Sequence, residues 1–260
     1  MKIDLSGRVA AVTGGSLGLG RAMAKSFAAA GADVALIARR EDVLREAQEE
    51  ISATAAGRVE IFPCDVREAD AIETTYRGIV DTLGAPDIMV NNAGTSKTGP
   101  FLSHDDATWQ HDLDLKLFAA IRFCRLAIPA MQAQRWGRVI NVLNIGAKAP
   151  GAKSVPTSVS RAAGLALTKA LSKEYAPDNV LVNALCTGIL VSDQWLQRYK
   201  AEGGEGSFED WCAEKGRQVP LGRMGEAEEY ANMACFLASD AASYITGVAI
   251  NVDGGMSPVA

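Results

Sequence analysis

Several features that would assign this chain of 260 residues to a specialised class of protein are missing. No apolar run reaches the roughly 18–20 residues that a membrane-spanning helix needs. Residues 1–5 lack the apolar core of a signal peptide. We therefore expect no membrane partner and a cytoplasmic location. The net charge of −5 provides no basic surface, so we also expect no nucleic-acid partner.

Cysteine and histidine are too few and too scattered to form a disulfide framework or a metal site. The five cysteines are odd in number and never form a Cys-x-x-Cys pair, and only two histidines are present. We expect buried, reduced thiols and no bound metal. A chain that is 48% hydrophobic and 22% charged is instead typical of one large globular domain.

Short apolar runs alternate with longer segments of helical periodicity. Seven runs predict strands, at residues 9–12, 34–38, 59–63, 88–90, 139–143, 180–185 and 249–252. The segments between them predict helices, at residues 20–30, 41–55, 68–83, 109–135, 158–175 and 226–237. This alternation predicts an α/β fold with a single domain over residues 1–260, a Rossmann-type doubly wound parallel sheet of about seven strands.

One segment, residues 192–219, interrupts this alternation. It has no predicted strand, contains a glycine-rich stretch at residues 203–206, and carries four aromatic side chains, Trp195, Tyr199, Phe208 and Trp211. Long insertions in compact domains are usually functional, which favours a substrate lid. The alternative is a surface loop without regular structure.

The strongest functional signal is the glycine-rich turn at residues 13–20, between the first predicted strand and the first predicted helix. Its glycines let the backbone turn tightly and approach a pyrophosphate, whose charge the helix N-terminus stabilises. We therefore expect a dinucleotide at the carboxyl ends of the strands. The residues expected to hold it there are Thr13, Gly14, Ser16, Leu17, Gly18, Gly20, Asp65, Val66, Asn91, Ala93 and Gly94.

The end of the second predicted strand favours NADP(H) over NAD(H). An NAD enzyme would place an acidic residue there for the ribose 2′-hydroxyl, but this chain has Ala38. Arg39 and Arg40 follow and can pair with a 2′-phosphate, although a solvated strand end is the alternative interpretation. Asp65, after the third strand, can accept a hydrogen bond from the adenine amine.

Several motifs together resemble those of the short-chain dehydrogenase/reductase family. They lie at residues 13–20, 64–66, 91–94, 220–225 and 247–255, so the resemblance covers the whole chain. It implies an NADP(H)-dependent oxidoreductase whose small-molecule substrate, an apolar alcohol or ketone, lies under the aromatic lid. It also implies a homotetramer, and contacts from Gly188 and Ser192 to the nicotinamide end of the cofactor.

The resemblance also predicts an atypical catalytic site. Where the family usually carries Asn, Ser, Tyr and Lys, this chain has Lys116, Asn144, Thr157 and Arg161. A threonine holds its proton too tightly to replace the tyrosine near neutral pH, and arginine stays charged. Asn144 can donate a hydrogen bond to a carbonyl oxygen, and Arg161 can hold the ribose hydroxyls. Proton transfer then requires an ordered water, or Lys116 with a pKa lowered by burial.

Each catalytic candidate also has a purely structural interpretation. Thr157 follows Pro156 and can be a helix N-cap, Arg161 can form a salt bridge, and Lys116 can be an exposed or snorkelling side chain. Tyr199 in the lid is a further candidate proton donor. Two other functions stay open: a non-redox enzyme of lyase, isomerase or dehalogenase-like type, and a non-catalytic NADP(H)-binding subunit.

Overall fold

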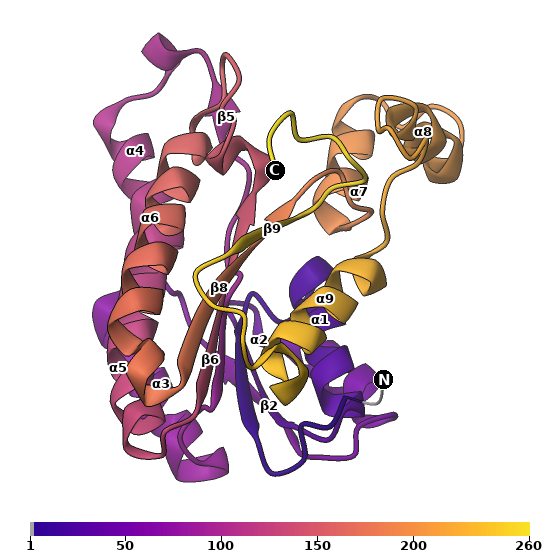
Figure 1. Ribbon diagram of the computed structural model, residues 1–260. Helices are drawn as coiled ribbons and strands as arrows, with labels where there is room; N and C mark the ends of the chain where they lie inside the picture. Colours follow the sequence, from indigo (N-terminus) through magenta and orange to yellow (C-terminus); the bar gives the residue numbers. More distant parts are fainter. Residues whose placement is uncertain (1–2) are drawn as a thin grey trace.

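The computed structural model describes residues 3–260. They form three layers, in which helices cover both faces of a central parallel sheet (Figure 1). The sheet has seven strands in the order β3-β2-β1-β4-β6-β8-β9. They are β1 (Val9–Thr13), β2 (Asp33–Ala38), β3 (Val59–Pro63), β4 (Ile88–Asn91), β6 (Gly137–Asn144), β8 (Val180–Thr187) and β9 (Ala249–Val252). The predicted α/β fold and its doubly wound sheet are confirmed.

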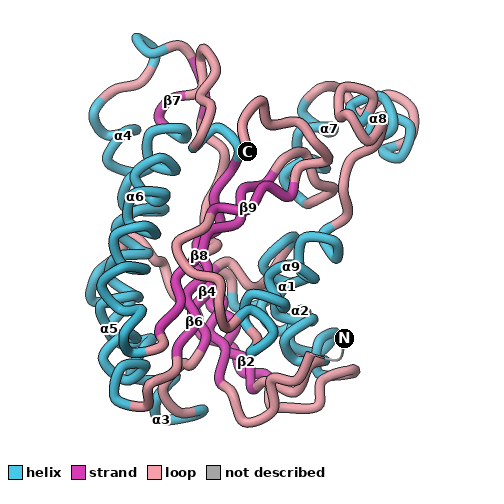
Figure 2. Tube along the Cα trace, in the orientation of Figure 1, coloured by secondary structure: helices cyan, strands magenta, loops and turns pink. Residues whose placement is uncertain are grey.

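Helices cover both faces of this sheet, as Figures 1 and 2 show. On one face lie α1 (Gly18–Ala29), α2 (Glu41–Ser52) and α9 (Ala227–Ala238). On the other lie α3 (Ala69–Leu83), α5 (Ala119–Ala133) and α6 (Thr157–Tyr175). Short 3-10 turns occur at η1 (Phe101–Ser103), η3 (Ile145–Ala147), η4 (Ala176–Asp178) and η5 (Asp240–Ala242).

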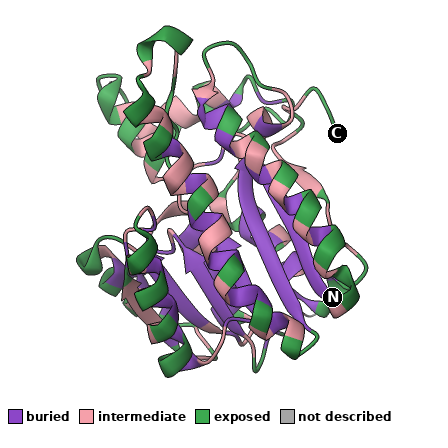
Figure 3. Ribbon diagram, turned by 90° about the vertical axis from the view of Figure 1, so that its left-hand side faces the viewer, coloured by how far each residue is buried: buried purple, intermediate pink, exposed green. Residues whose placement is uncertain are grey.

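The apolar runs in the sequence follow from this double cover. In β1, Ala10 and Val12 pack in a cluster with Phe27 of α1, whereas the alternate residue Ala11 packs on the opposite face with Ile79 of α3. Successive strand residues point to opposite faces, so a strand that is covered on both sides is apolar throughout. In Figure 3 the strands are buried and the outer faces of the helices are exposed.

The structure departs from the sequence prediction near the carboxyl ends of the strands. The helix predicted over residues 109–135 is divided into α4 (Asp106–Leu113), a π-helical turn η2 (Asp114–Phe118) and α5. Two short strands, β5 (Thr98–Gly99) and β7 (Val155–Pro156), pair antiparallel above the sheet and were not predicted. Strands of two residues carry no periodicity that a sequence pattern can reveal.

Residues 192–219 form two helices rather than an irregular loop: α7 (Asp193–Ala201) and α8 (Phe208–Gly216). Their aromatic side chains pack on one another, with ring centroids 5.8 Å apart for Trp195 and Trp211 and 5.5 Å apart for Tyr199 and Phe208. These contacts hold the helix pair together beside the C-terminal end of the chain (Figure 1).

None of the helices formed by residues 3–260 is long and apolar enough to cross a membrane. Within the same residues, His, Cys, Asp and Glu side chains form no group of three that could hold a metal ion. Every cysteine is a free thiol; Cys212 is half-buried and the other four are buried.

The glycine-rich turn requires a very close approach of backbone to backbone. A Cβ on Gly20 would lie 2.0 Å from the carbonyl oxygen of Gly14 and 2.6 Å from Nδ2 of Asn92. Asn92 in turn donates through Nδ2 to the carbonyl oxygen of Thr13 at 2.9 Å. Helix α1 can therefore begin directly beneath the end of β1 only with glycine at position 20.

We expect Gly20→Ala to destabilise the fold because the methyl group would overlap the Gly14 carbonyl. Overpacking of this kind costs about 1–3 kcal/mol or more, roughly 2–4 °C in Tm per kcal/mol for a chain of this size. Thermal unfolding followed by circular dichroism measures the change. Gly151→Ala is the control because a Cβ there meets nothing within 4 Å. Equal Tm values for the two variants would contradict the close-approach argument.

Candidate functional site

The carboxyl ends of β1 and β4 are joined by one hydroxyl group. Oγ1 of Thr13 donates to the Val90 carbonyl oxygen at 3.1 Å. It accepts hydrogen bonds from the backbone N–H groups of Asn92 at 2.9 Å and Ala93 at 3.0 Å. Thr13 thereby holds residues 91–94 next to the glycine-rich turn, as expected for the wall of a dinucleotide site.

The glycine-rich turn leaves the N-terminus of α1 open. Gly14 and Gly18 have φ values of +65° and +52°, which favour glycine. The N-cap Leu17 offers no side-chain acceptor, and the first turn of α1 contains no acidic residue. The free N–H groups and the helix dipole therefore suit a phosphate. Ser16, also predicted to contact the cofactor, is buried in this turn.

The side chains predicted to select NADP(H) lie at the solvent-exposed end of β2. Arg39 and Arg40 are exposed, and within residues 3–260 neither side chain forms a hydrogen bond or an ion pair. Nearby, Asp65 accepts hydrogen bonds from Arg67, one of them from Nε at 2.9 Å. These bonds lower the pKa of Asp65 and occupy part of its capacity to accept from an adenine amine. Val66, the next residue, is buried.

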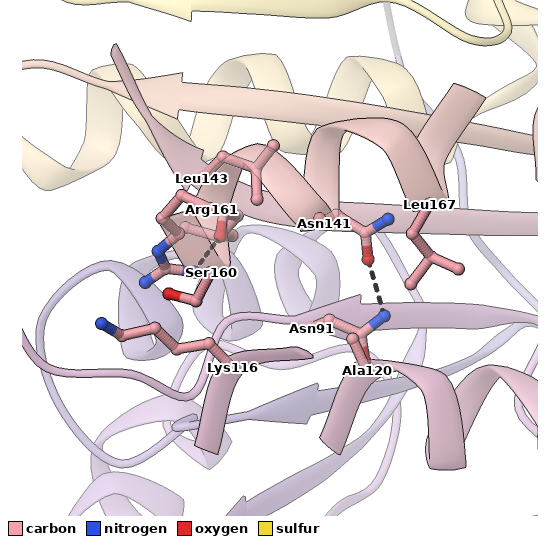
Figure 4. Close-up of a pocket in the computed structure, with 10 residues that line it drawn as sticks. Asn91, Lys116, Ala120, Asn141, Leu143, Ser160, Arg161 and Leu167 are labelled. Carbon is pink, nitrogen blue, oxygen red and sulfur yellow. Dashed lines mark hydrogen bonds between the residues drawn. The ribbon is translucent and has the colours of Figure 1, made fainter. Parts of the chain in front are cut away.

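A small cavity of about 10 Å³, room for roughly one water molecule, lies at the carboxyl ends of β4 and β6 (Figure 4). Lys116, Ser160 and Arg161 gather at one end of it, and Asn91 and Asn141 meet at the other through a hydrogen bond of 2.8 Å. Three predicted site residues, Asn91, Lys116 and Arg161, are thus brought together.

Lys116 is buried, which contradicts the interpretation as an exposed or snorkelling side chain. Its side chain is 1% exposed. It lies in the π-helical turn η2, a type of turn that is rare and often occurs at functional sites. Its Nζ donates to Oδ1 of Asp112 and, at 2.8 Å, to Oγ1 of Thr157. Burial, followed by the positive charge of Arg161, lowers the pKa of Lys116 to about 8, although Asp112 opposes both effects.

Thr157 is not the N-cap of α6, so that interpretation was wrong. The helix begins at Thr157, and its N-cap is Pro156, which has no side chain that could cap it. The Thr157 hydroxyl contacts the backbone of Lys97 instead, accepting from its N–H at 2.9 Å and donating to its carbonyl oxygen at 2.8 Å. The β5–β7 ladder, which the sequence did not predict, brings these two segments together. With Lys116 as a third partner, the hydroxyl has no proton left for a ligand.

Arg161 forms no ion pair with residues 3–260, so the salt-bridge interpretation was also wrong. It donates to the Val142 carbonyl oxygen, and its buried Nε has no partner. Burial lowers its pKa. Its Nη2 lies 2.7 Å from the position that a Cβ on Gly94 would occupy, so glycine at position 94 leaves the room that the guanidinium needs.

Near the site, two further buried side-chain oxygens have no hydrogen-bond partner among residues 3–260. They are Oδ1 of Asn91, at the cavity, and Oδ1 of Asn144, at the end of β6. Buried polar groups normally form hydrogen bonds. Together with Nε of Arg161, they are groups that a cofactor or substrate with hydroxyl and carbonyl groups can satisfy. This unsatisfied set and the open glycine-rich turn fit a nicotinamide dinucleotide.

The segment predicted to be a lid, residues 192–219, meets the glycine-rich turn at its first residue. The Cβ of Ser192 lies 3.6 Å from the position that a Cβ on Gly18 would occupy, and the Ser192 side chain does not cap α7. Gly188 lies against Asp253, whose Cα would be 2.6 Å from a Cβ on Gly188. Tyr199 is a poor proton donor because its hydroxyl contacts the carbonyl oxygens of the lid turn at 204 and 206.

The sequence analysis missed two residues of this site, Asp112 and Ser160. Asp112 lies four residues before Lys116 and forms an ion pair with it. The Oδ2 atom of Asp112 also accepts a hydrogen bond from Oγ of Ser160 at 2.6 Å. Opposite charges at i and i+4 on a predicted helix were a signal available in the sequence. Ser160 carried no such signal, since it meets Asp112 only through the packing of α6.

Comparisons with known proteins agree with this architecture. Residues 14–257 match the family model described as enoyl-(acyl carrier protein) reductase. The chain is 33% identical over 263 residues to the 3-oxoacyl-(acyl-carrier-protein) reductase FabG of Aquifex aeolicus, covering 98% of this chain and 100% of that protein.

Two solved structures are also similar over nearly the whole chain. L-sorbose reductase from Gluconobacter frateurii, complexed with NADPH and L-sorbose, is 32% identical with a TM-score of 0.95, and 100% of each chain is covered. An NADPH-bound short-chain oxidoreductase from Pseudomonas aeruginosa PAO1, described as containing an atypical catalytic center, is 35% identical with a TM-score of 0.91, covering 99% of this chain and 100% of that one. With these relatives and this sheet, the chain belongs to the short-chain dehydrogenase/reductase family of NAD(P)H-dependent oxidoreductases.

Proposed function

We propose that this protein is an NADP(H)-dependent oxidoreductase that interconverts a ketone and an alcohol with Lys116 as its proton donor. The observation that carries the proposal is the burial of Lys116 beside Arg161, with a pKa near 8. An amine with this pKa is mostly protonated at pH 7 and can still release its proton, as a general acid requires. The similar Pseudomonas aeruginosa enzyme, with its atypical catalytic center, supports the idea that the family tolerates such a change.

NADP(H), when bound, supplies or accepts the hydride. We assign its 2′-phosphate to Arg39 and Arg40, which are exposed and have no ion-pair partner among residues 3–260. We assign its pyrophosphate to the open N-terminus of α1, and its nicotinamide ribose to the unpaired Nε of Arg161. Two similar reductases are described as NADPH complexes, which supports this choice of cofactor.

The chain's own residues then handle the carbonyl group and the proton. Lys116 holds a proton on Nζ and delivers it to the oxygen on which negative charge develops. We assign to Asn144, at the end of β6, the role of orienting the same oxygen by donating a hydrogen bond from Nδ2. The Thr157 hydroxyl orients the Lys116 ammonium by accepting a hydrogen bond from Nζ.

The aromatic side chains of the proposed lid, α7 and α8, pack against one another. They include Phe208 and Trp211 with centroids 6.1 Å apart, so less of their apolar surface faces the site than the sequence suggests. We keep an apolar ketone or alcohol as the proposed substrate class and include hydroxyketones in its test. A homotetramer remains a prediction.

We expect NADPH to bind more tightly than NADH, because Arg39 can pair with the 2′-phosphate. Arg39→Ala should weaken NADPH binding about tenfold or more, since a hydrogen bond to a charged group contributes about 1.5–3 kcal/mol. NADH binding should barely change. Fluorescence titration of the purified protein measures both. Arg77→Ala, an exposed arginine on α3, is the control and should leave both affinities unchanged. Equal affinities for NADPH and NADH in the unsubstituted protein would contradict the assignment.

We expect kcat/KM for ketone reduction to be constant at lower pH and to fall as pH rises through about 8, because the pKa of Lys116 is lowered to about 8 and only the protonated amine donates. Alcohol oxidation should rise over the same range. Lys116→Met should reduce kcat by about 10²–10⁴-fold, the usual contribution of a general acid. The measurement is NADPH oxidation with a panel of apolar ketones and hydroxyketones. NADPH binding without hydride transfer to any of them would favour the non-catalytic subunit instead.

A further inference from the structure

The carboxylate of Asp112 is the buried partner of Lys116, and it does not belong to the four positions that the family resemblance identifies. Its side chain is 3% exposed. Oδ1 accepts from the Lys116 ammonium, and Oδ2 accepts from the Ser160 hydroxyl at 2.6 Å. The two donors come from η2 and α6, so the carboxylate is oriented from two separate elements.

The ammonium of Lys116 is oriented just as tightly. One N–H points to Asp112 and a second to the Thr157 hydroxyl. Among residues 3–260 the third N–H has no partner. The tetrahedral geometry of the amine therefore fixes the direction of that third N–H once the other two are held, and it leaves one donor free on a side chain that lines the cavity of Figure 4.

A purely structural role does not account well for this pair. Replacing a buried ion pair with well-packed apolar residues is often neutral or stabilising, so burial of two charges is weak evidence for stability. Here Lys116 lines the cavity, next to a second, half-buried cation, Arg161. This arrangement fits a role in positioning the proton of Lys116 better than a role in stabilising the packing of α4 against α6.

We propose that Asp112, oriented by Ser160, is a positioning residue that keeps Lys116 protonated and directs its free N–H toward the substrate. This inference rests on the proposed function, in which Lys116 donates the proton. In reduction, the proton leaves Nζ for the substrate oxygen while the hydride comes from NADPH. The neutral amine then faces the Asp112 carboxylate, which favours the uptake of a replacement proton from water.

The charges around Lys116 determine the direction of the expected effects. The ionisable groups that face it are Asp112 from α4 and Arg161 from α6. Burial and Arg161 lower the pKa of Lys116, and Asp112 raises it. Without the Asp112 carboxylate, nothing opposes the lowering of the Lys116 pKa by burial and by Arg161. An opposite charge this close typically shifts a pKa by about 1–3 units.

The test is an NMR titration of the cofactor-free protein carrying lysine labelled with ¹³C at Cε, with the Lys116 signal assigned from Lys116→Met. The expected midpoint for Lys116 is near 8, below the other lysines. Asp112→Asn should lower it by about one unit or more, and Asp112→Glu, which keeps the charge, should restore most of the shift. Asp114→Asn is the control, because it removes an equal charge from the same turn but its carboxylate faces Arg122.

Ser160→Ala provides a second test if Asp112→Asn does not fold. A carboxylate that loses a hydrogen-bond donor holds a neighbouring ammonium proton more strongly, so the midpoint of Lys116 should rise. If Asp112 served only in packing, the titration midpoint of Lys116 would not shift in opposite directions in Asp112→Asn and Ser160→Ala. Unchanged midpoints in Asp112→Asn and Ser160→Ala, or an equal shift in Asp114→Asn, would overturn the inference.

Kinetics separates this inference from the proposed function. At pH 8, Asp112→Asn should lower kcat/KM for reduction by between about 5- and 50-fold, which corresponds to a pKa lowered by one to two units. The NADPH affinity should stay unchanged. If the unsubstituted protein reduces no ketone, the proposed function fails while the NMR titration still decides the role of Asp112. If reduction occurs but its pH profile is the same in Asp112→Asn, only the present inference fails.

Discussion

The rest of the structure depends on a parallel sheet that helices cover on both faces. Neither face of such a sheet is exposed to solvent, so polar side chains gather where the strands end. Thr13, Asn91 and Asn144 lie at the carboxyl ends of β1, β4 and β6, side by side because these strands are parallel and consecutive in the sheet. The apolar core that stabilises the fold therefore also determines where chemistry can take place.

At that edge, the balance of charge decides which reactions are possible. Asp112 and Lys116 neutralise each other, and Arg161 is left as a half-buried cation, with a buried Nε, that has no ion-pair partner among residues 3–260. An excess positive charge in a place of low dielectric stabilises negative charge nearby far more than it would in water. This suits both a dinucleotide phosphate ester and the oxygen of a ketone as it accepts a hydride.

The repeating parts of the fold could be predicted from the sequence, and the catalytic geometry could not. The seven apolar runs coincide with the seven strands because helices cover both faces of the sheet, which makes the strands largely apolar. The positions of Lys116 and Arg161 in the site were also predicted. The sequence left open whether Lys116 is buried or exposed, because a π-helical turn has no periodic signature within a continuous helical pattern. The role of Thr157 was misjudged because its partner, Lys97, is brought near by a ladder of only two residues per strand.

The Lys116–Asp112 pair also constrains how such a site could have arisen. A buried ammonium without its carboxylate, or the reverse, leaves an uncompensated charge that is strongly destabilising, by about 3–5 kcal/mol. An ancestor that had acquired only one of the two residues would have folded poorly, unless the side chain of that residue stayed uncharged. The two codons therefore changed together or in one favoured order. Relatives that carry lysine at position 116 should also carry an acid at position 112, so this pair can mark the subgroup in sequence comparisons.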